Sequence, residues 1–295
     1  MIPFDYLKPA TLEDLLEGLR SANGEGALLA GGTDLHVKMR LGLKSPRLLF
    51  DISELAAARN IVEAEGSLRI GACVTMSELM ASPLVARLAP SLAEAARSMS
   101  CRQIRNRATL GGNIVTASPA ADSVPALLAA DARALIVGPG GLRELALAEL
   151  LLGPGRTALG PGEVLLEVLL PLPEAGHRSL YFKVGRRRAQ AISVISLAGG
   201  VSLAADVRIG SARIALGAVA PTVMRARQAE RFLEGELPSA VNLAAAAALA
   251  GEECSPITDV RASGAGRRLL VEAWTHRLLQ QLCATSGDDA GGNRP

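Results

Sequence analysis

The chain has 295 residues, 49% of them hydrophobic, which is enough to build two domains or one large core. Its 31 basic and 29 acidic residues give a formal net charge of +2. Such an even balance argues against a dedicated nucleic-acid or membrane-surface protein, which would carry a strongly basic face. The sequence shows no apolar run of about 18 residues and no charged-then-apolar leader, so we expect no membrane span and a cytoplasmic location.

The first piece of the chain, residues 1–57, is expected to be a small α/β unit. Thr11 is placed to cap a helix, with an acidic residue three positions later and leucines at helical spacing after it. Residues 28–30 are predicted to form a strand that ends in two glycines. A short helix and a second strand at 48–52 should complete the unit.

The second piece, residues 58–175, is expected to hold a mixed sheet that opens with a hairpin around a Glu-Gly turn. A loop rich in glycine and short polar residues interrupts it at 105–122. The expected elements are strands at 61–64 and 67–72, helices at 75–80, 90–98 and 122–131, and strands at 133–137 and 163–170.

The third piece, residues 178–284, is expected to be a smaller domain in which helices cover one face of a sheet. The predicted elements are strands at 180–184, 191–203 and 207–219, then helices at 224–233, 240–251 and 267–283. The fold class is therefore α+β, with a disordered tail expected at 285–295.

The four cysteines, Cys73, Cys101, Cys254 and Cys283, are scattered along the chain. None of the spacings used for zinc or iron–sulfur ligation occurs among them, and the histidines form no metal pattern either. We therefore expect reduced thiols that pack in the interior, and no metal site.

Two stretches are typical of ligand loops: Gly31-Gly32-Thr33-Asp34 and residues 105–122. Adjacent glycines let a ligand approach bare N–H groups, and the first amides of a helix can hold a phosphate without a lysine. Neither stretch is a P-loop or a Gly-x-Gly-x-x-Gly fingerprint. Two such loops favour a long ligand, although each could also be only a turn-rich connection.

Six short blocks in one order carry a resemblance to a known family. The blocks are Ala30-Gly31-Gly32-Thr33-Asp34, Ile104-Arg105-Asn106, Thr109-Leu110-Gly111-Gly112-Asn113, Ala117-Ser118-Pro119, Gly153-Pro154-Gly155-Arg156-Thr157 and Phe182-Lys183. The chain resembles, over nearly its whole length, the FAD-binding medium subunit of the molybdenum hydroxylases, the group of xanthine dehydrogenase and carbon monoxide dehydrogenase. The form of the second loop is most like that of bacterial xanthine dehydrogenase flavin subunits.

The resemblance implies a fold and a cofactor. It implies an FAD-binding domain of the vanillyl-alcohol-oxidase-like (PCMH) type over 1–175, made of subdomains 1–57 and 58–175. A flavoprotein C-terminal domain with a three-stranded sheet should follow at 178–284. It further implies FAD contacts, with no catalytic or metal-binding side chains, at Leu28, Leu29, Ala30, Gly31, Gly32, Thr33, Asp34, Leu35, Met99, Ile104, Thr109, Leu110, Gly111, Gly112, Asn113, Ala117, Ser118, Asp122, Leu165 and Lys183.

Asp122 and the segment after Lys183 carry second interpretations. A carboxylate at the start of a helix is a good N-cap, so Asp122 could cap the helix at 122–131 as well as bind a flavin hydroxyl. Lys183 matches the family lysine that reaches the flavin. The arginine run at 186–188 is more typical of a solvated face than of a cofactor or partner contact.

The implied function is electron transfer within a larger enzyme. A flavin couples one-electron carriers to two-electron acceptors. The resemblance implies that a [2Fe-2S] small subunit and a molybdopterin-binding large subunit supply the electrons, in a hetero-oligomer such as a dimer of heterotrimers. The acceptor is expected to be NAD, with quinone, ferredoxin or oxygen as alternatives.

Three other functions remain open at this point. The chain could be a nucleotide-binding assembly or sensing module that performs no electron transfer. It could be a free-standing flavin oxidase or reductase, although the third piece resembles the hydroxylase subunit instead. It could also serve a sister enzyme that acts on aldehydes, N-heterocycles or carbon monoxide.

Overall fold

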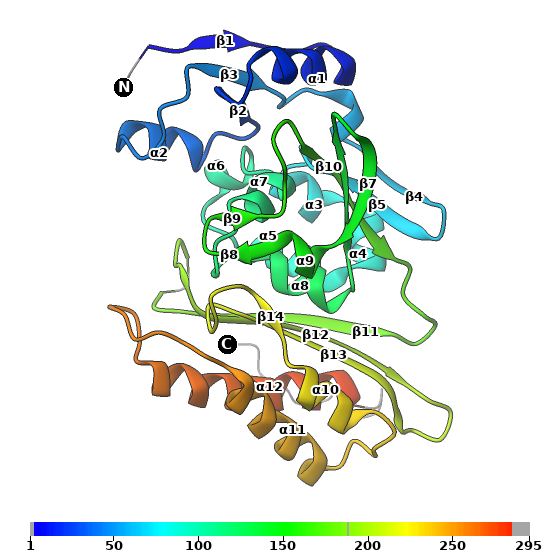
Figure 1. Ribbon diagram of the computed structural model, residues 1–295. Coiled ribbons are helices and arrows are strands. Elements are labelled where there is room, and N and C mark those ends of the chain that lie inside the picture. The colour runs from blue at the N-terminus through cyan, green and yellow to red at the C-terminus, as the bar shows by residue number, and fades with distance from the viewer. Residues whose placement is uncertain (1–2, 188, 285–295) are drawn as a thin grey trace.

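The computed structural model describes residues 3–187 and 189–284. The tail expected at 285–295 and Arg188 of the arginine run lie outside the described residues. An N-terminal unit, a middle unit and a C-terminal domain follow one another along the chain and are stacked from top to bottom in Figure 1.

The N-terminal unit is a small parallel sheet with a helix packed against it. Its elements are β1 (Asp5–Leu7), α1 (Leu12–Ser21), β2 (Gly26–Leu29), α2 (Leu35–Arg40) and β3 (Leu48–Asp51), with strand order β1-β3-β2. The predicted start of α1 is confirmed, because Thr11 and Asp14 form a reciprocal capping box. Leu15 of α1 and Phe50 of β3 are fully buried together. The glycine turn after β2 leads directly into α2.

The middle unit is built on a five-stranded antiparallel sheet in the order β4-β5-β10-β6-β7. Its strands are β4 (Ile61–Ala64), β5 (Ser67–Gly71), β6 (Arg133–Gly138), β7 (Gly141–Ala146) and β10 (Val164–Pro171), with a separate pair β8 (Leu151–Gly153) and β9 (Arg156–Thr157). The predicted hairpin is confirmed: Glu65 and Gly66 both have positive φ, as a tight two-residue turn requires. The apolar strand β10 lies in the centre of this sheet and is buried along almost its whole length.

Short helices cover the middle sheet. They are η1 (Ala56–Ala58), α3 (Met76–Ala81), α4 (Pro83–Leu88), α5 (Pro90–Ser98), α6 (Arg102–Arg105), α7 (Leu110–Val115), α8 (Ser123–Ala129) and α9 (Leu147–Leu150). Thr75 caps α3 in a second capping box with Glu78. The segment expected as one loop at 105–122 thus contains a helix, α7, whose buried Leu110 and Ile114 join the core of the middle unit.

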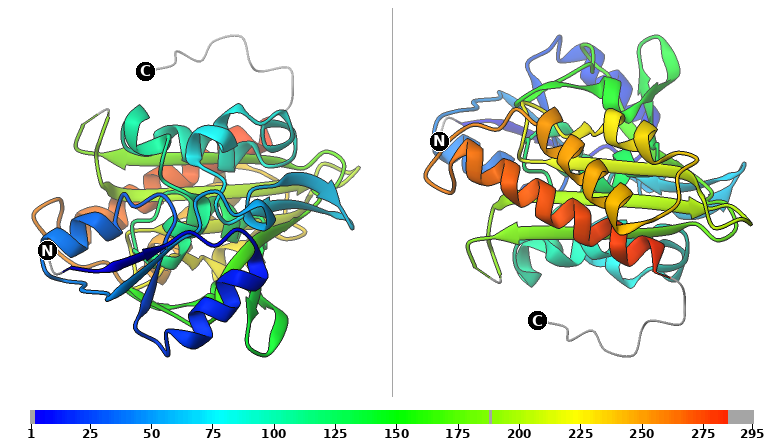
Figure 2. Two further views of the ribbon diagram at one scale, coloured as in Figure 1. Left: turned by 90° about the horizontal axis from the view of Figure 1, so that it is seen from above. Right: turned by 90° about the horizontal axis from the view of Figure 1, so that it is seen from below.

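The C-terminal domain is a sheet covered on one face by helices and on the other by the middle unit. Its strands are β11 (Arg178–Gly185), β12 (Ser193–Leu203), β13 (Ile209–Gly217) and β14 (Met224–Arg225), and its helices are α10 (Arg227–Leu233), α11 (Ala240–Glu253) and α12 (Gly264–Cys283). Figure 2 shows the three helices lying across the sheet. Because α5 and α8 pack on the opposite face, strand β12 is buried along nearly its whole length.

The C-terminal sheet differs from expectation in one detail. The three predicted strands are present, and a fourth, the two-residue β14, occupies the start of the helix predicted at 224–233. Met224 and Arg225 pair with β13 before α10 begins at Arg227. Among the described residues, the longest apolar stretches in helices are too short or too polar to cross a membrane.

Candidate functional site

The first glycine loop, between β2 and α2, touches the backbone that precedes α7. A Cβ atom on Gly31 would lie 1.9 Å from the carbonyl oxygen of Arg107 and 3.1 Å from the Cα of Ala108. Only glycine allows so close an approach of two backbones. Gly32 has φ +73°, a conformation that L side chains rarely adopt. The N-terminal and middle units are therefore joined at this loop.

The amides of the first loop are open to a ligand. His36 N–H donates to the Gly32 carbonyl, but the amides of Gly32, Thr33 and Asp34 have no hydrogen-bond partner among the residues that the structure describes. Successive backbone N–H groups with this freedom form an anion-binding concavity. The prediction of a phosphate-binding turn at this loop thus has the geometry that it requires.

The second glycine loop is different, because its amides are used inside the protein. Leu110 N–H donates to the Val74 carbonyl at 2.9 Å, and Gly111 N–H to the Ala72 carbonyl at 2.8 Å. Gly112 N–H donates to the Thr109 hydroxyl, which caps α7. The expectation of bare N–H groups at this loop is therefore wrong. A Cβ on Gly111 would lie 2.6 Å from the Ala72 side chain, so close packing explains that glycine.

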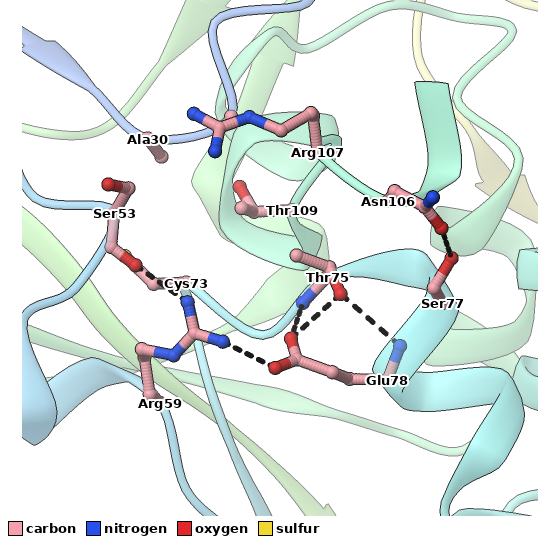
Figure 3. Close-up of a pocket in the computed structure, with 11 residues that line it drawn as sticks. Ala30, Ser53, Arg59, Cys73, Thr75, Ser77, Glu78, Asn106, Arg107 and Thr109 are labelled. Carbon is pink, nitrogen blue, oxygen red and sulfur yellow. Dashed lines mark hydrogen bonds and ion pairs between the residues drawn. The ribbon is translucent and has the colours of Figure 1, made fainter. Parts of the chain in front are cut away.

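A first hollow of about 360 Å³ lies between the N-terminal and middle units (Figure 3). It is lined by Ala30, Gly31, Ser53, Arg59, Cys73, Thr75, Ser77, Glu78, Asn106, Arg107 and Thr109. The Arg59 guanidinium forms an ion pair with Glu78, whereas Arg107 extends beside Ala30 without a charged partner in the described chain. Burial raises the pKa of the Cys73 thiol to about 12, so that group is not a reactive thiolate.

A second hollow of about 380 Å³, the junction hollow, lies where the first loop, the middle unit and the C-terminal domain meet. It is lined by Asp34, Met99, Ser100, Asn113, Ser118, Ala120, Ala121, Asp122, Gln190, Ala191 and Ile192. The hydroxyl of Thr116 donates to the Asp34 carboxylate at 3.4 Å, which fixes the end of α7 beside the start of α2. The short loop from Gly31 to Asp34 therefore runs from one hollow to the other.

Asp122 is the buried charge at the junction hollow. Its residue is 7% exposed, and its carboxylate accepts from Lys183 at 2.7 Å, Ser193 at 2.9 Å and Tyr181 at 3.3 Å. Asp122 stands at the N-cap position of α8 but makes no side-chain capping bond. The helix-cap interpretation is therefore wrong, because three donors from the C-terminal domain take up the carboxylate instead.

The hollows bring together some of the residues proposed from the sequence and not others. The first hollow is lined by Ala30, Gly31 and Thr109, and the junction hollow by Asp34, Met99, Asn113, Ser118 and Asp122. Lys183 reaches the junction hollow through its ion pair with Asp122. Residues that line neither hollow are Leu28, Leu29, Gly32, Thr33, Leu35, Ile104, Leu110, Gly111, Gly112, Ala117 and Leu165. Leu110 and Leu165 are core residues.

Sequence reasoning missed several polar groups. Arg59 and Ser193 were not singled out, and both lie far in sequence from the glycine loops that they approach. Thr75 and Glu78 carried a readable signal, the Thr-x-x-Glu capping box, but that signal indicates a helix start and not a ligand. Among the described residues, no three His, Cys, Asp or Glu side chains gather as a metal site would require.

Comparison with known proteins decides the family. Residues 2–173 match the family model for the FAD binding domain in molybdopterin dehydrogenase, and residues 180–282 match that for the CO dehydrogenase flavoprotein C-terminal domain. The chain belongs to the FAD-binding subunits of the molybdenum hydroxylases. It is an oxidoreductase component, and its cofactor is FAD.

Relatives and solved structures agree with this assignment. The chain is 34% identical to the putative xanthine dehydrogenase FAD-binding subunit XdhB of Escherichia coli K12, over 96% of this chain and 97% of that protein. It is 32% identical to the carbon monoxide dehydrogenase medium chain of Hydrogenophaga pseudoflava, over 96% and 99%. A solved Cu,Mo-CO dehydrogenase chain superposes with a TM-score of 0.91 at 28% identity, covering 96% and 99%. Quinoline 2-oxidoreductase from Pseudomonas putida 86 gives 0.89 at 29%, covering 96% and 97%.

The geometry fits this cofactor. FAD is a long molecule with a pyrophosphate at its centre, and the loop with open amides lies between two hollows of similar size. One hollow is ringed by hydroxyl and guanidinium groups, and the other combines Met99 and Ile192 with the Asp122 carboxylate. This arrangement suits a ligand whose two halves differ in chemistry.

Proposed function

We propose that this chain holds FAD across the first glycine loop and passes electrons from a partner subunit to NAD. The observation that carries the proposal is the position of the open amides of Gly32, Thr33 and Asp34 between the two hollows. The pyrophosphate would accept hydrogen bonds from these amides. FAD supplies the exchange of one or two electrons, and the chain supplies its binding and orientation.

We further propose that the isoalloxazine ring lies in the junction hollow and the adenosine half in the first hollow. The junction hollow offers apolar surface from Met99 and Ile192 and a buried ion pair between Asp122 and Lys183. A ring with an apolar edge and a polar edge needs both kinds of surface. The first hollow is richer in hydroxyl and guanidinium groups, which suit a ribose and its phosphate.

The other contacts proposed from the sequence have supporting roles under this proposal. Thr109 holds α7 and lines the first hollow, while Asn113 lines the junction hollow and accepts from the Ser123 hydroxyl at 2.6 Å. Leu165 is buried behind the site, so its proposed contribution is packing and not a direct polar contact.

We propose that the electron donor is a [2Fe-2S] subunit that docks beside the junction hollow, with a molybdopterin-binding subunit beyond it. The exposed Ile192 lines this hollow, and the exposed Val37 lies on α2, which begins directly after Asp34 at the wall of the hollow. Val260, also exposed, lies in the loop before α12. Helix α2 and the loop before α12 lie on the same side of the molecule in Figure 1, and Arg186 ties the β11–β12 turn to the Val260 carbonyl. Exposed apolar residues beside a binding site suit a protein interface. A dimer of heterotrimers in the cytoplasm is the assembly that we expect.

The experiment that tests this function uses the purified chain alone and together with its co-expressed partner subunits. Acid release should yield one FAD per chain, and the lone chain should not oxidise hypoxanthine. The reconstituted complex should oxidise hypoxanthine and reduce NAD. Turnover by the lone chain would overturn the division of labour, whereas flavin that neither donor nor acceptor can reduce or oxidise would favour a binding or sensing module.

Substrate and acceptor are tested in the same assay. If the complex turns over an aldehyde, an N-heterocycle or carbon monoxide but not hypoxanthine, the xanthine dehydrogenase proposal fails while the role of the flavin subunit stands. If it reduces a quinone dye, ferredoxin or oxygen but not NAD, only the acceptor proposal fails.

A further inference from the structure

The Asp122 carboxylate joins two domains through donors that all come from one of them. Asp122 belongs to the middle unit, at the start of α8. Tyr181 and Lys183 lie two residues apart on β11, so their side chains share one face of the C-terminal sheet, and Ser193 begins β12. Closure of the C-terminal domain on the middle unit therefore assembles this cluster.

The two carboxylate oxygens have different partners. Oδ2 accepts from the Lys183 ammonium at 2.7 Å, whereas Oδ1 accepts from the Ser193 hydroxyl at 2.9 Å and the Tyr181 hydroxyl at 3.3 Å. The side chains of Asp122 and Lys183 are each only 10% exposed. A buried carboxylate has several acceptor sites, and a single ammonium bonded to Oδ2 leaves those of Oδ1 without a donor. The two hydroxyls donate to Oδ1, the oxygen that Lys183 does not bond.

The hydroxyl donors are held firmly in place. Burial, together with the nearby Asp122 charge, raises the pKa of Tyr181 well above its usual value, so this phenol stays a neutral donor. The residue after Ser193 is fixed by Arg267, which donates to the Val194 carbonyl at 2.6 Å and to the Ala218 carbonyl at 2.9 Å. Ala218 N–H in turn donates to the Pro119 carbonyl, close before Asp122.

We propose that Ser193 and Tyr181 are positioning residues, whose hydroxyls hold the Asp122 carboxylate and its Lys183 partner at the wall of the junction hollow and so set the affinity and the potential of the flavin. The inference rests on the proposed function, in which the isoalloxazine lies in that hollow. Without the hydroxyls, the carboxylate is less neutralised and can turn away from its present orientation. The added negative field disfavours the reduced, more negative flavin, so its midpoint potential should fall.

The test uses the full-length chain with Tyr181→Phe, Ser193→Ala and the double variant. The double variant should bind FAD about tenfold more weakly, because Asp122 and Lys183 lose two donors that hold them in the orientation facing the hollow. Its bound flavin should have a lower midpoint potential and a shifted absorption spectrum. The single variant Ser193→Thr, which keeps the hydroxyl, should have the FAD affinity and the midpoint potential of the wild type.

Two matched controls come from the chain itself. Ser202 is also buried on β12, but its hydroxyl contacts His177 at the other end of the strand. Tyr6, the other of the two tyrosines, donates a hydrogen bond to Asp51 in the N-terminal unit. Ser202→Ala and Tyr6→Phe should leave the flavin potential unchanged.

The outcomes separate this inference from the function beneath it. Variants that melt earlier but keep the wild-type FAD affinity and potential would show that the hydroxyls serve packing only, and would overturn the inference. An equal shift in the Ser202→Ala control would overturn it as well. A wild-type chain that takes up no FAD would overturn the proposed function itself, and the inference with it.

Discussion

Gly31→Ala is the sharpest test of where the cofactor phosphates bind. The added Cβ would lie 1.9 Å from the Arg107 carbonyl oxygen, while ordinary contact begins at 3.4 Å, so the two backbones must separate by about 1.5 Å. No side-chain rotation relieves the overlap, because both partners are backbone. The second backbone is also fixed, since Ala108 N–H donates to the Ile104 carbonyl at 2.7 Å.

The expected magnitude follows from this displacement. Overpacking of this kind costs about 1–3 kcal/mol of stability. A movement of more than 1 Å would also break at least one of the hydrogen bonds that we propose between the loop amides and the charged pyrophosphate, each worth about 1.5–3 kcal/mol. The Kd for FAD should therefore rise about 10- to 100-fold.

Titration of the apo chain with FAD, followed by flavin fluorescence, measures this change. Gly140→Ala is the matched control, since its Cβ would meet nothing within 4 Å in the β6–β7 turn. If Gly31→Ala binds FAD with the wild-type Kd and stoichiometry, the pyrophosphate does not lie on this loop and the reasoning is refuted.

Three further changes test the surroundings of the site. Thr109→Ala should lower the free energy of unfolding of the apo chain by about 0.5–2 kcal/mol in urea titrations, because its hydroxyl caps α7. Asp131→Asn should lower the apo melting temperature without changing the Kd for FAD, because its carboxylate pairs with Arg213 and Arg225 of the C-terminal domain and lines neither hollow. Glu163→Gln should make the free energy of unfolding depend less on pH in acid. Hydrogen bonds from Arg143 lower the pKa of Glu163 to about 2. The carboxylate therefore contributes its full stability above its usual pKa of 4.5, and this contribution is lost as the pH falls toward 2. Urea midpoints between pH 2 and 6 would show this, with the exposed Glu149→Gln as the variant that should keep the wild-type slope.

Local signals in the sequence predicted local structure well. The capping box of Thr11 places the start of α1, and the Glu65-Gly66 turn places the β4–β5 hairpin, because both depend on residues within a few positions of each other. Strand β14 escaped prediction for the opposite reason. Its two residues are extended only because they pair with β13, and a helix begins two residues later.

The role of Asp122 shows the same limit at the site. Its position before an apolar helical stretch favours an N-cap, and nothing nearby in the sequence argues otherwise. Its actual partners lie 59, 61 and 71 residues later, at Tyr181, Lys183 and Ser193. The resemblance supplied Asp122 and Lys183 as separate contacts. Only the folded arrangement shows that they bind each other.

The two glycine pairs, so alike in sequence, serve different physical needs. In the first pair, the amides of Gly32 and its successors are open, and Gly31 is required for the close approach of the Arg107 backbone. In the second pair, both amides are satisfied within the protein, and a Cβ on Gly111 would lie 2.6 Å from the Ala72 side chain. A side chain at Gly111 should therefore cost stability equally with and without FAD, whereas one at Gly31 should cost more when FAD is present. The same Gly-Gly pair thus occurs in one loop whose open amides suit an anion and in another that lets a helix lie against the sheet behind it.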